Sequence, residues 1–372
     1  MRYNNNITSL NKNRKQNNKV FINIFTDFLS ICLFVIIFML VLNPSRYMQS
    51  VNDGILLFFV SVFPSLFPFF FISKILTELG TIERLSNLTK KFVEKVFRVP
   101  AITSYAFLMS IICGYPVGAK IIGDLHESNV ISDTEAHHMI KLCTTSGPIF
   151  VIGSVGVKML GDYKLGLLIF VSHITSSVIS AFVLRPKKSK ILKDEKVNIL
   201  KNQNYCKPCL QAQLNKKTDL QQPQNTKNKN VDNILASSVN SSIMSILTVG
   251  AFVSIFFMFI DILYDLQILN FLKDGIEYIL NLLKIDSACG KGIASGIVEM
   301  TRGINELGIV QNKILKLVFV SGLVSFGGFS IILQSLVFLS KTKIKTLKFI
   351  GFKCFQSFVT MLVSTILGLI FY

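Results

Sequence analysis

Residues 111–123 read IICGYPVGAKIIG, and residues 144–153 read TTSGPIFVIG. Both stretches lie in apolar runs long enough to enter a membrane, and both are interrupted by Gly and Pro. A backbone group without a partner is costly in lipid, so a broken helix is stable only where it faces protein or a watery cavity. The free N–H groups and positive dipole end at such a break favour anions. The two stretches therefore predict a solute site built from discontinuous helices or, alternatively, helix kinks and packing glycines.

The composition is typical of a membrane protein. The chain has 372 residues, of which 51% are hydrophobic, and several apolar runs approach the ~20 residues that span a bilayer. No cleavage site follows the first run, so we expect a retained helix. The sequence contains no GxxxxGKS/T phosphate loop, His/Glu metal helix or nucleophile elbow. We therefore predict an all-α polytopic membrane protein that is not an enzyme and that has no cofactor and no metal site.

The net charge of +18 is concentrated in three segments. Residues 1–20 carry five basic residues, residues 185–230 carry twelve basic and three acidic residues, and residues 341–353 carry five Lys. Because these segments flank membrane spans, we interpret them as positive-inside topology signals and predict no nucleic-acid partner. This places the N-terminus and the 185–230 segment in the cytosol. That segment contains one CxxC, Cys206 and Cys209, without the two nearby further ligands that a zinc site needs.

The order of segments recurs after the basic linker and predicts two membrane repeats. We expect a disordered basic N-terminus (1–24), a first membrane helix (25–50), repeat one (51–184), a cytosolic polar linker (185–233) and repeat two (234–372). In each repeat an apolar span precedes an amphipathic segment, a Gly-rich broken segment and two further spans.

Charge predicts that the two repeats are inverted relative to each other. The amphipathic segment 77–99 carries five basic and three acidic residues, whereas its counterpart 264–286 carries two Lys and four acidic residues. The positive-inside rule places them on opposite faces, as in secondary transporters with a midplane site of broken helices. Counting crossings leaves one segment per repeat that must enter and return. We expect these re-entrant hairpins at GYPVG (114–118) and EMTRG (299–303).

Several motifs resemble the sporulation integral membrane protein family of endospore-forming bacteria, whose members carry the nucleoside-recognition (Gate) domain. The resemblance rests on SVFPSLFPFFFISKIL (61–76), FRVP (97–100), GYPVGAKIIGDL (114–125), TSGPIFVIGSVG (145–156), YKLGLLIFVSH (163–173) and EMTRGI (299–304). The long polar linker departs from the family pattern. The resemblance implies a stage V sporulation role in the membrane around the forespore and transport of dipicolinate, whereas the Gate label alone implies nucleosides or ions.

A planar dianion such as dipicolinate needs two positive groups. Lys120 and Arg302 occupy corresponding broken segments, so a pseudo-twofold axis could bring them together, with the Arg binding one carboxylate bidentately. The structural alternative pairs Lys120 with Asp124, and Arg302 with Glu299 or Glu306. Glu299 could instead take a coupling proton or Na⁺.

These arguments give a predicted site and a predicted function. The expected substrate-binding residues are Gly114, Pro116, Gly118, Lys120, Ser146, Gly147, Pro148, Arg302, Ser325, Gly327 and Gly328, and Glu299 is the expected coupling-ion residue. His173, inside a predicted span, is either a packed, hydrogen-bonded side chain or a proton relay. We predict a secondary transporter that moves a small anionic solute, dipicolinate, across the outer forespore membrane. A nucleoside or ion transporter and a non-transporting sporulation scaffold are the alternatives.

Overall fold

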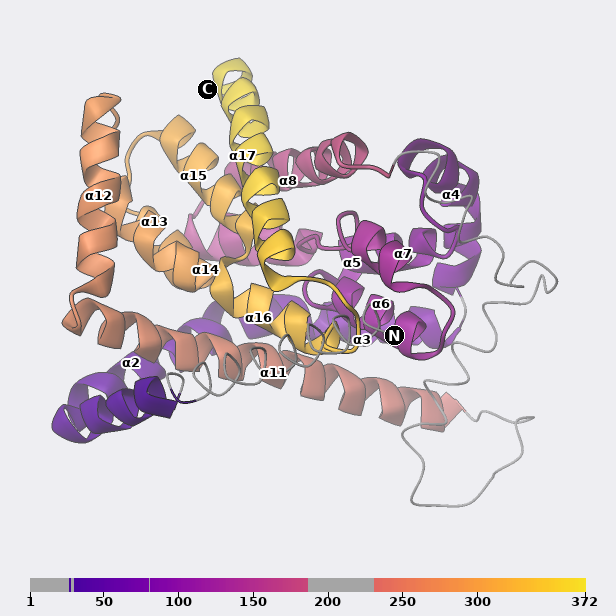
Figure 1. The fold of residues 1–372 in the computed structure, drawn as a ribbon, viewed down its shortest axis with the longest axis horizontal. Coiled ribbons are helices and arrows are strands. Elements are labelled where there is room, and N and C mark those ends of the chain that lie inside the picture. The colour runs from indigo at the N-terminus through magenta and orange to yellow at the C-terminus, as the bar shows by residue number, and fades with distance from the viewer. Residues whose placement is uncertain (1–26, 28–29, 80, 187–230) are drawn as a thin grey trace, which may run out of the picture.

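The computed structural model describes residues 27, 30–79, 81–186 and 231–372, and every regular element within them is helical. The predicted all-α fold class is therefore confirmed (Figure 1). The segment 1–24 and most of the linker, including Cys206 and Cys209, lie outside the described residues.

The first half of the chain is a series of helices with two π-helical stretches. Its elements are α2 (Pro44–Leu57), η1 (Phe58–Val62), α3 (Phe63–Glu78), α4 (Thr81–Phe97), α5 (Thr103–Cys113), α6 (Val117–Glu127), α7 (Asp133–Met139), η2 (Ile149–Met159) and α8 (Tyr163–Val183). The second half consists of α11 (Val231–Asp265), α12 (Ile268–Leu282), α13 (Cys289–Val298), α14 (Met300–Leu307), α15 (Lys313–Phe326), α16 (Gly328–Phe338) and α17 (Thr346–Phe371). The order of element types recurs between the halves; their predicted inversion in the membrane stays a prediction.

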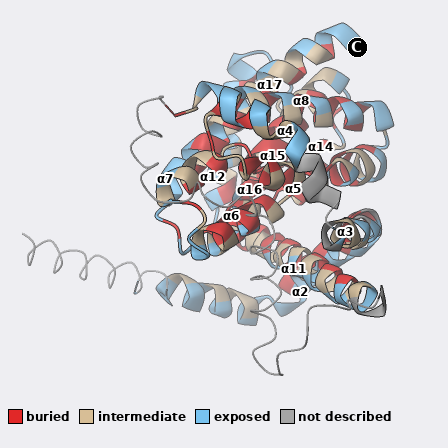
Figure 2. Ribbon diagram, turned by 90° about the vertical axis from the view of Figure 1, so that its right-hand side faces the viewer, coloured by how far each residue is buried: buried red, intermediate tan, exposed pale blue. Residues whose placement is uncertain are grey.

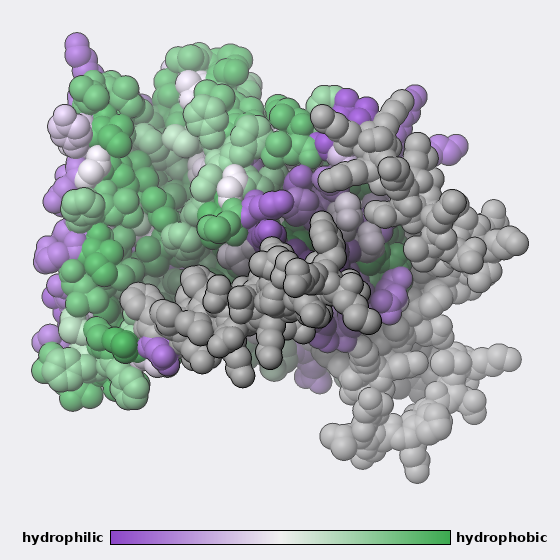
Figure 3. Space-filling view, viewed as in Figure 1, coloured by the Kyte–Doolittle hydropathy of each residue, from purple (hydrophilic) through white to green (hydrophobic). Residues whose placement is uncertain are grey.

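Four helical stretches in the described residues are long and apolar enough to cross a bilayer. They are Tyr163–Val183, Ile234–Asp265, Lys313–Phe338 and Thr346–Phe371, and a fifth candidate is the bent pair Ser30–Leu42 and Pro44–Val62. Figure 3 shows a largely hydrophobic outer face over α12 and α17. Large apolar side chains of these two helices, such as Phe271 and Phe358, are exposed. An apolar exterior of this kind is compatible with lipid and unfavourable in water, so the chain is an integral membrane protein.

Each half contains a pair of short helices that folds back on itself at the predicted segment; their re-entry into the membrane stays a prediction. In the second half, Gly303 packs against Gly296 and Leu307 packs against Gly292, so α13 and α14 run antiparallel. In the first half, α5 and α6 are joined at 114–116, and Gly118 lies against Ser110. The Gly residues allow this close packing of backbones.

Capping side chains fix where several helices begin. Ser132 and Glu135 form the reciprocal capping box of α7, as their spacing indicates. Asp162 accepts a hydrogen bond from the backbone N–H of Leu165 at the start of α8 (3.0 Å). These polar turns interrupt the apolar runs and set the register of the helices that follow.

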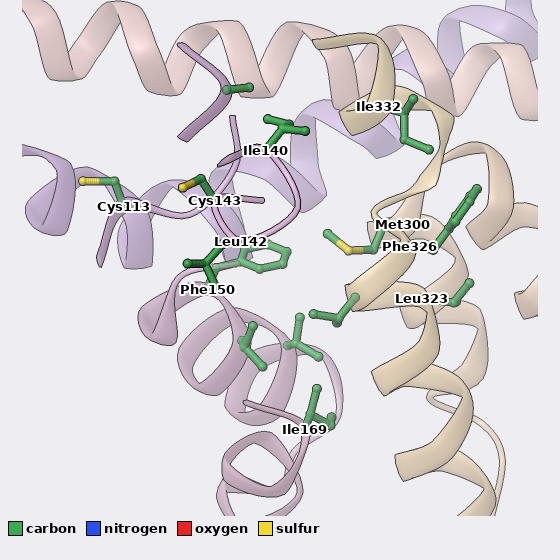
Figure 4. Close-up of a cluster of buried hydrophobic side chains, with 14 of the residues drawn as sticks. Cys113, Ile140, Leu142, Cys143, Phe150, Ile169, Met300, Leu323, Phe326 and Ile332 are labelled. Carbon is green, nitrogen blue, oxygen red and sulfur yellow. The ribbon is translucent and has the colours of Figure 1, made fainter. Parts of the chain in front are cut away.

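The interior joins the two halves. Buried residues concentrate in α5, α6, α15 and α16, whereas α12 and α17 carry exposed faces (Figure 2). Figure 4 shows Cys113, Cys143 and Phe150 from the first half in one cluster with Met300 and Phe326 from the second. The core therefore lies where the broken segments of the two halves meet.

Candidate solute site

The tips of both hairpins meet the breaks of both interrupted spans at a small cavity of about 50 Å³. Its polar side is formed by Gly114, Tyr115, Ser146, Gly147, Glu299, Thr301, Ser330 and Gln334, and its apolar side by Val62, Leu66, Cys113, Phe150, Val249, Val253, Met300 and Ile331. Residues from both halves of the chain thus enclose one space.

Four helices begin at this cavity. They are α6, η2, α14 and α16, which start at Val117, Ile149, Met300 and Gly328. Each helix N-terminus carries partial positive charge, and at α14 the side chain of Glu299 accepts from the backbone N–H of Arg302. The C-terminal ends of α5, α13 and α15 lie at the same breaks and supply carbonyl oxygens. Discontinuous helices in secondary transporters bind anionic groups at helix N-termini and cations at helix C-termini.

The first hairpin is held against the first break by a close backbone approach. A Cβ atom added to Gly118 would lie 1.8 Å from the carbonyl oxygen of Cys143, so no larger residue fits. The hydroxyl of Ser110 donates to the same carbonyl (2.7 Å) and accepts from the backbone N–H of Thr145 (3.0 Å). In the second half, the chain breaks at Gly327, whose φ of 86° favours glycine.

Glu299 is the one carboxylate among the lining residues, and its side chain is almost fully buried. It caps α14: its Oε2 atom accepts from the backbone N–H of Arg302 (2.8 Å) and from the hydroxyl of Thr301. Among the described residues, none of the lining side chains is Lys or Arg. The lining itself therefore supplies no side-chain cation, and its favourable groups for an anion are the helix N-termini.

His173 joins the two span breaks behind the cavity. Its Nε2 atom accepts from the backbone N–H of Ser146 (2.8 Å), and its Nδ1 atom lies 2.6 Å from the hydroxyl of Ser325. Because Nε2 accepts, the proton of a neutral imidazole is on Nδ1, which donates to Ser325. Thr360 also donates to Ser325 (2.7 Å). These contacts are those expected for a packed, hydrogen-bonded His173, one of the two alternatives considered for this residue.

Tyr115 and Lys353 form a second contact between the halves. The hydroxyl of Tyr115, at the tip of the first hairpin, donates to the carbonyl of Val324 (2.9 Å) and accepts from the ammonium of Lys353 (3.3 Å). Lys353 is 1% exposed. Counting charges along the sequence assigns Lys353 to the basic flank 341–353, but it lies inside α17. Lys353 lies six residues into the last apolar run, and this position was the sequence signal that could have placed it inside the helix.

Arg302 lies outside the lining of the small cavity. It borders a separate polar pocket of about 380 Å³, together with Arg46, Asp261, Tyr264, Asp265, Gln267, Asn270, Lys273 and Lys291. Its guanidinium contacts Asp261 (2.5 Å) and Glu306 (3.3 Å) and donates to the carbonyl of Phe257 (2.9 Å). Pairing with Glu306 was one of the structural alternatives. Glu299, the other, contacts the backbone of Arg302 and not its side chain.

The structure brings together only part of the predicted site. Gly114, Ser146, Gly147 and Glu299 line the cavity, and Pro116, Gly118, Pro148, Ser325, Gly327 and Gly328 lie in the adjoining breaks and helix starts without lining it. Lys120 is exposed on α6 and borders neither pocket. A joint role of Lys120 and Arg302 as carboxylate ligands stays a prediction.

Comparison with known proteins supports the sequence resemblance. The Gate family model, described as nucleoside recognition, matches residues 59–163. The chain is 27% identical over 304 residues to the sporulation integral membrane protein YlbJ of Bacillus subtilis (strain 168), a match that covers 82% of this chain and 73% of that protein.

Solved structures of CNTnw share the fold. A doubly substituted variant in an outward-facing state has a TM-score of 0.54 at 12% identity and covers 84% of this chain and 76% of that one. CNTnw in an inward-facing, substrate-bound state gives 0.50 at 14% identity, with coverage of 84% and 75%. At these identities the likeness shows the fold alone, which is the membrane fold of the concentrative nucleoside transporters.

Proposed function

We propose that this chain, which has a transporter fold and resembles a sporulation membrane protein, is a secondary transporter that carries dipicolinate from the mother cell across the outer forespore membrane. The observation that carries the proposal is the meeting of two hairpin tips and four helix N-termini at one buried cavity. Discontinuous helices at a shared interior point are the arrangement with which secondary transporters bind solutes. A scaffold that carries no solute has no need of it.

The size of the cavity implies that transport requires the hairpin tips to separate. Its volume of about 50 Å³ leaves room for a few water molecules at most. Pockets that hold drug-sized ligands measure roughly 300–1,000 Å³. Dipicolinate, a substituted aromatic ring, therefore enters only after Tyr115 and the residues around Glu299 move apart. The motion required is a rearrangement of the two hairpins against the broken spans.

Glu299 gives this transport an expected coupling. An ionised carboxylate in the cavity repels a dianion, so the bound state favours Glu299 when it is protonated or neutralised by a cation. By linkage, the solute and the proton or cation then increase each other's affinity. The C-terminal carbonyl ends at the same breaks are suitable ligands for a cation such as Na⁺. Glu299 is accordingly our candidate for the coupling residue.

Uptake by the purified protein in proteoliposomes tests the proposal. We expect saturable uptake of labelled dipicolinate that unlabelled dipicolinate inhibits and nucleosides do not, and that responds to an imposed pH or Na⁺ gradient. In cells, deletion should leave dipicolinate synthesised but retained in the mother cell. Normal dipicolinate content in spores of the deletion strain would contradict the proposal.

Nucleoside transport is the second candidate, and Glu299 is the observation that favours it. A carboxylate and the hydroxyls of Thr301 and Ser330 suit the hydroxyl groups of a ribose, and the Gate match points the same way. Inhibition of uptake by nucleosides and not by dipicolinate would establish this function. Removing residues 187–230 addresses the scaffold alternative, because a transporter should retain uptake without them and a scaffold should lose its role in sporulation.

A further inference from the structure

Lys353 is a buried amine for which the contacts around the cavity supply no counter-charge. It lies in the first third of α17 with 1% of its surface exposed. Among the described residues, no carboxylate forms an ion pair with it. A charge inside a membrane protein without a partner lowers stability, so its presence indicates a functional requirement.

The polar atoms next to Lys353 are arranged as a donor site with spare capacity. Its ammonium group has three N–H donors, and its two hydrogen-bond acceptors are the hydroxyl of Tyr115 (3.3 Å) and Oε1 of Gln356 (3.0 Å). The amide nitrogen of Gln356 is buried and has no hydrogen-bond partner among the described residues. An unsatisfied amide donor beside an unpaired ammonium group matches a carboxylate, which accepts from both.

Tyr115 separates this donor site from the cavity. Its side chain lines the cavity, and its ring lies 4.9 Å from the ammonium of Lys353. The hydroxyl contacts the carbonyl of Val324 and the ammonium of Lys353, so the same side chain touches both the cavity and the donor site. Tyr115 is at the tip of the first hairpin, which must move before any solute larger than water can enter.

We propose that Lys353 is the cationic ligand for one carboxylate of the substrate and that movement of Tyr115 with the first hairpin exposes it. This inference rests on the proposed function and supplies the charge that the closed cavity lacks. Displacing Tyr115 removes a hydroxyl and a ring face from the ammonium, and a substrate carboxylate replaces both. The substrate class is then an aromatic or small carboxylate, and neutral solutes gain nothing from the residue.

The test compares Lys353→Met with Lys348→Met, a matched control that removes an exposed Lys from the same helix. Uptake of dipicolinate and of its neutral diamide is measured per inserted molecule, together with the thermal shift that each compound produces in detergent. We expect Lys353→Met to lower dipicolinate uptake about ten- to a hundredfold and to abolish the shift by dipicolinate. It should leave any response to the diamide unchanged and unfold at the same temperature as the wild type or a higher one. Lys348→Met should match the wild type.

The outcomes separate this inference from the proposed function. If the wild-type protein takes up dipicolinate and Lys353→Met does so equally well, the inference is wrong and the function stands. If the wild-type protein takes up none, the function and the inference both fail. Lys353→Gln keeps a polar group in place, so unfolding of both Lys353 variants would assign the residue a structural role and overturn the inference.

Discussion

Replacing Arg302 with Ala distinguishes a structural role from a ligand role for this residue. The guanidinium is 16% exposed and contacts Asp261, which is 18% exposed, at 2.5 Å. Breaking a buried ion pair by removing one partner costs about 3–5 kcal/mol. Ser50 still donates to Asp261 in the variant, so we expect the lower end, about 3 kcal/mol, or roughly a hundredfold in the folding equilibrium.

The double variant Arg302→Ala/Asp261→Asn provides the decisive comparison. It removes the charge of Asp261, and Glu306 keeps its contact with Lys291 (3.7 Å), so the structural role predicts recovery of most of the lost stability and of uptake per inserted molecule. Thermal unfolding in detergent and proteoliposome uptake measure the two quantities separately. If Arg302→Ala keeps wild-type stability but loses uptake, and the double variant does no better, Arg302 binds solute and our reasoning about the ion pair is refuted.

Three further predictions follow from single contacts. Gly118→Ala should abolish uptake because the added Cβ would lie 1.8 Å from a backbone carbonyl oxygen, whereas Gly275→Ala, which meets open space, should have no effect on the same assay. Glu299→Gln should remove the pH dependence of uptake if the coupling ion is a proton, or the response to a Na⁺ gradient if it is Na⁺; a variant that matches the wild type in both would exclude Glu299 as the coupling residue. The pKa of Asp133 is lowered by the backbone N–H and the ammonium of Lys343, so its contribution to stability is present above its unfolded pKa of about 3.9 and is lost as pH falls through the lower folded value. Unfolding temperatures at pH 7 and pH 3 should therefore differ less for Asp133→Asn than for the wild type.

The sequence was informative about the broken segments because local chemistry determines them. Gly and Pro at 114–118 interrupt a helix through their own backbone preferences. Counting crossings required one hairpin in each repeat, and 114–118 and 299–303 were the segments that we expected to form them; the capping role of Glu299 was not predicted. The capping box at Ser132 is equally local. These features were predictable because each depends on neighbours within a few residues.

Contacts between distant segments were not predictable in the same way. Helical spacing suggested Glu306 as a partner of Arg302. The other partner, Asp261, is 41 residues away in sequence and reaches Arg302 only because α11 packs beside it. Lys353 was assigned to a cytosolic flank because a count of charges along the sequence does not show how deep in the membrane each residue lies. Tyr115 lies in the GYPVG motif, yet its contact with Lys353 joins residues 238 apart. Such pairs become visible only once the two halves are packed together.

The length of α11 makes bilayer thickness relevant to this protein. Its apolar part, Ile234–Asp265, has 32 residues and measures about 48 Å at about 1.5 Å per residue, whereas the hydrocarbon layer is about 30 Å thick. Figure 1 shows α11 and α17 running in very different directions, so both cannot follow the bilayer normal. Either α11 is strongly tilted or the lipid around it deforms. Since α11 contributes Val249 and Val253 to the cavity wall, we expect the acyl-chain length of the surrounding lipid to alter the transport rate.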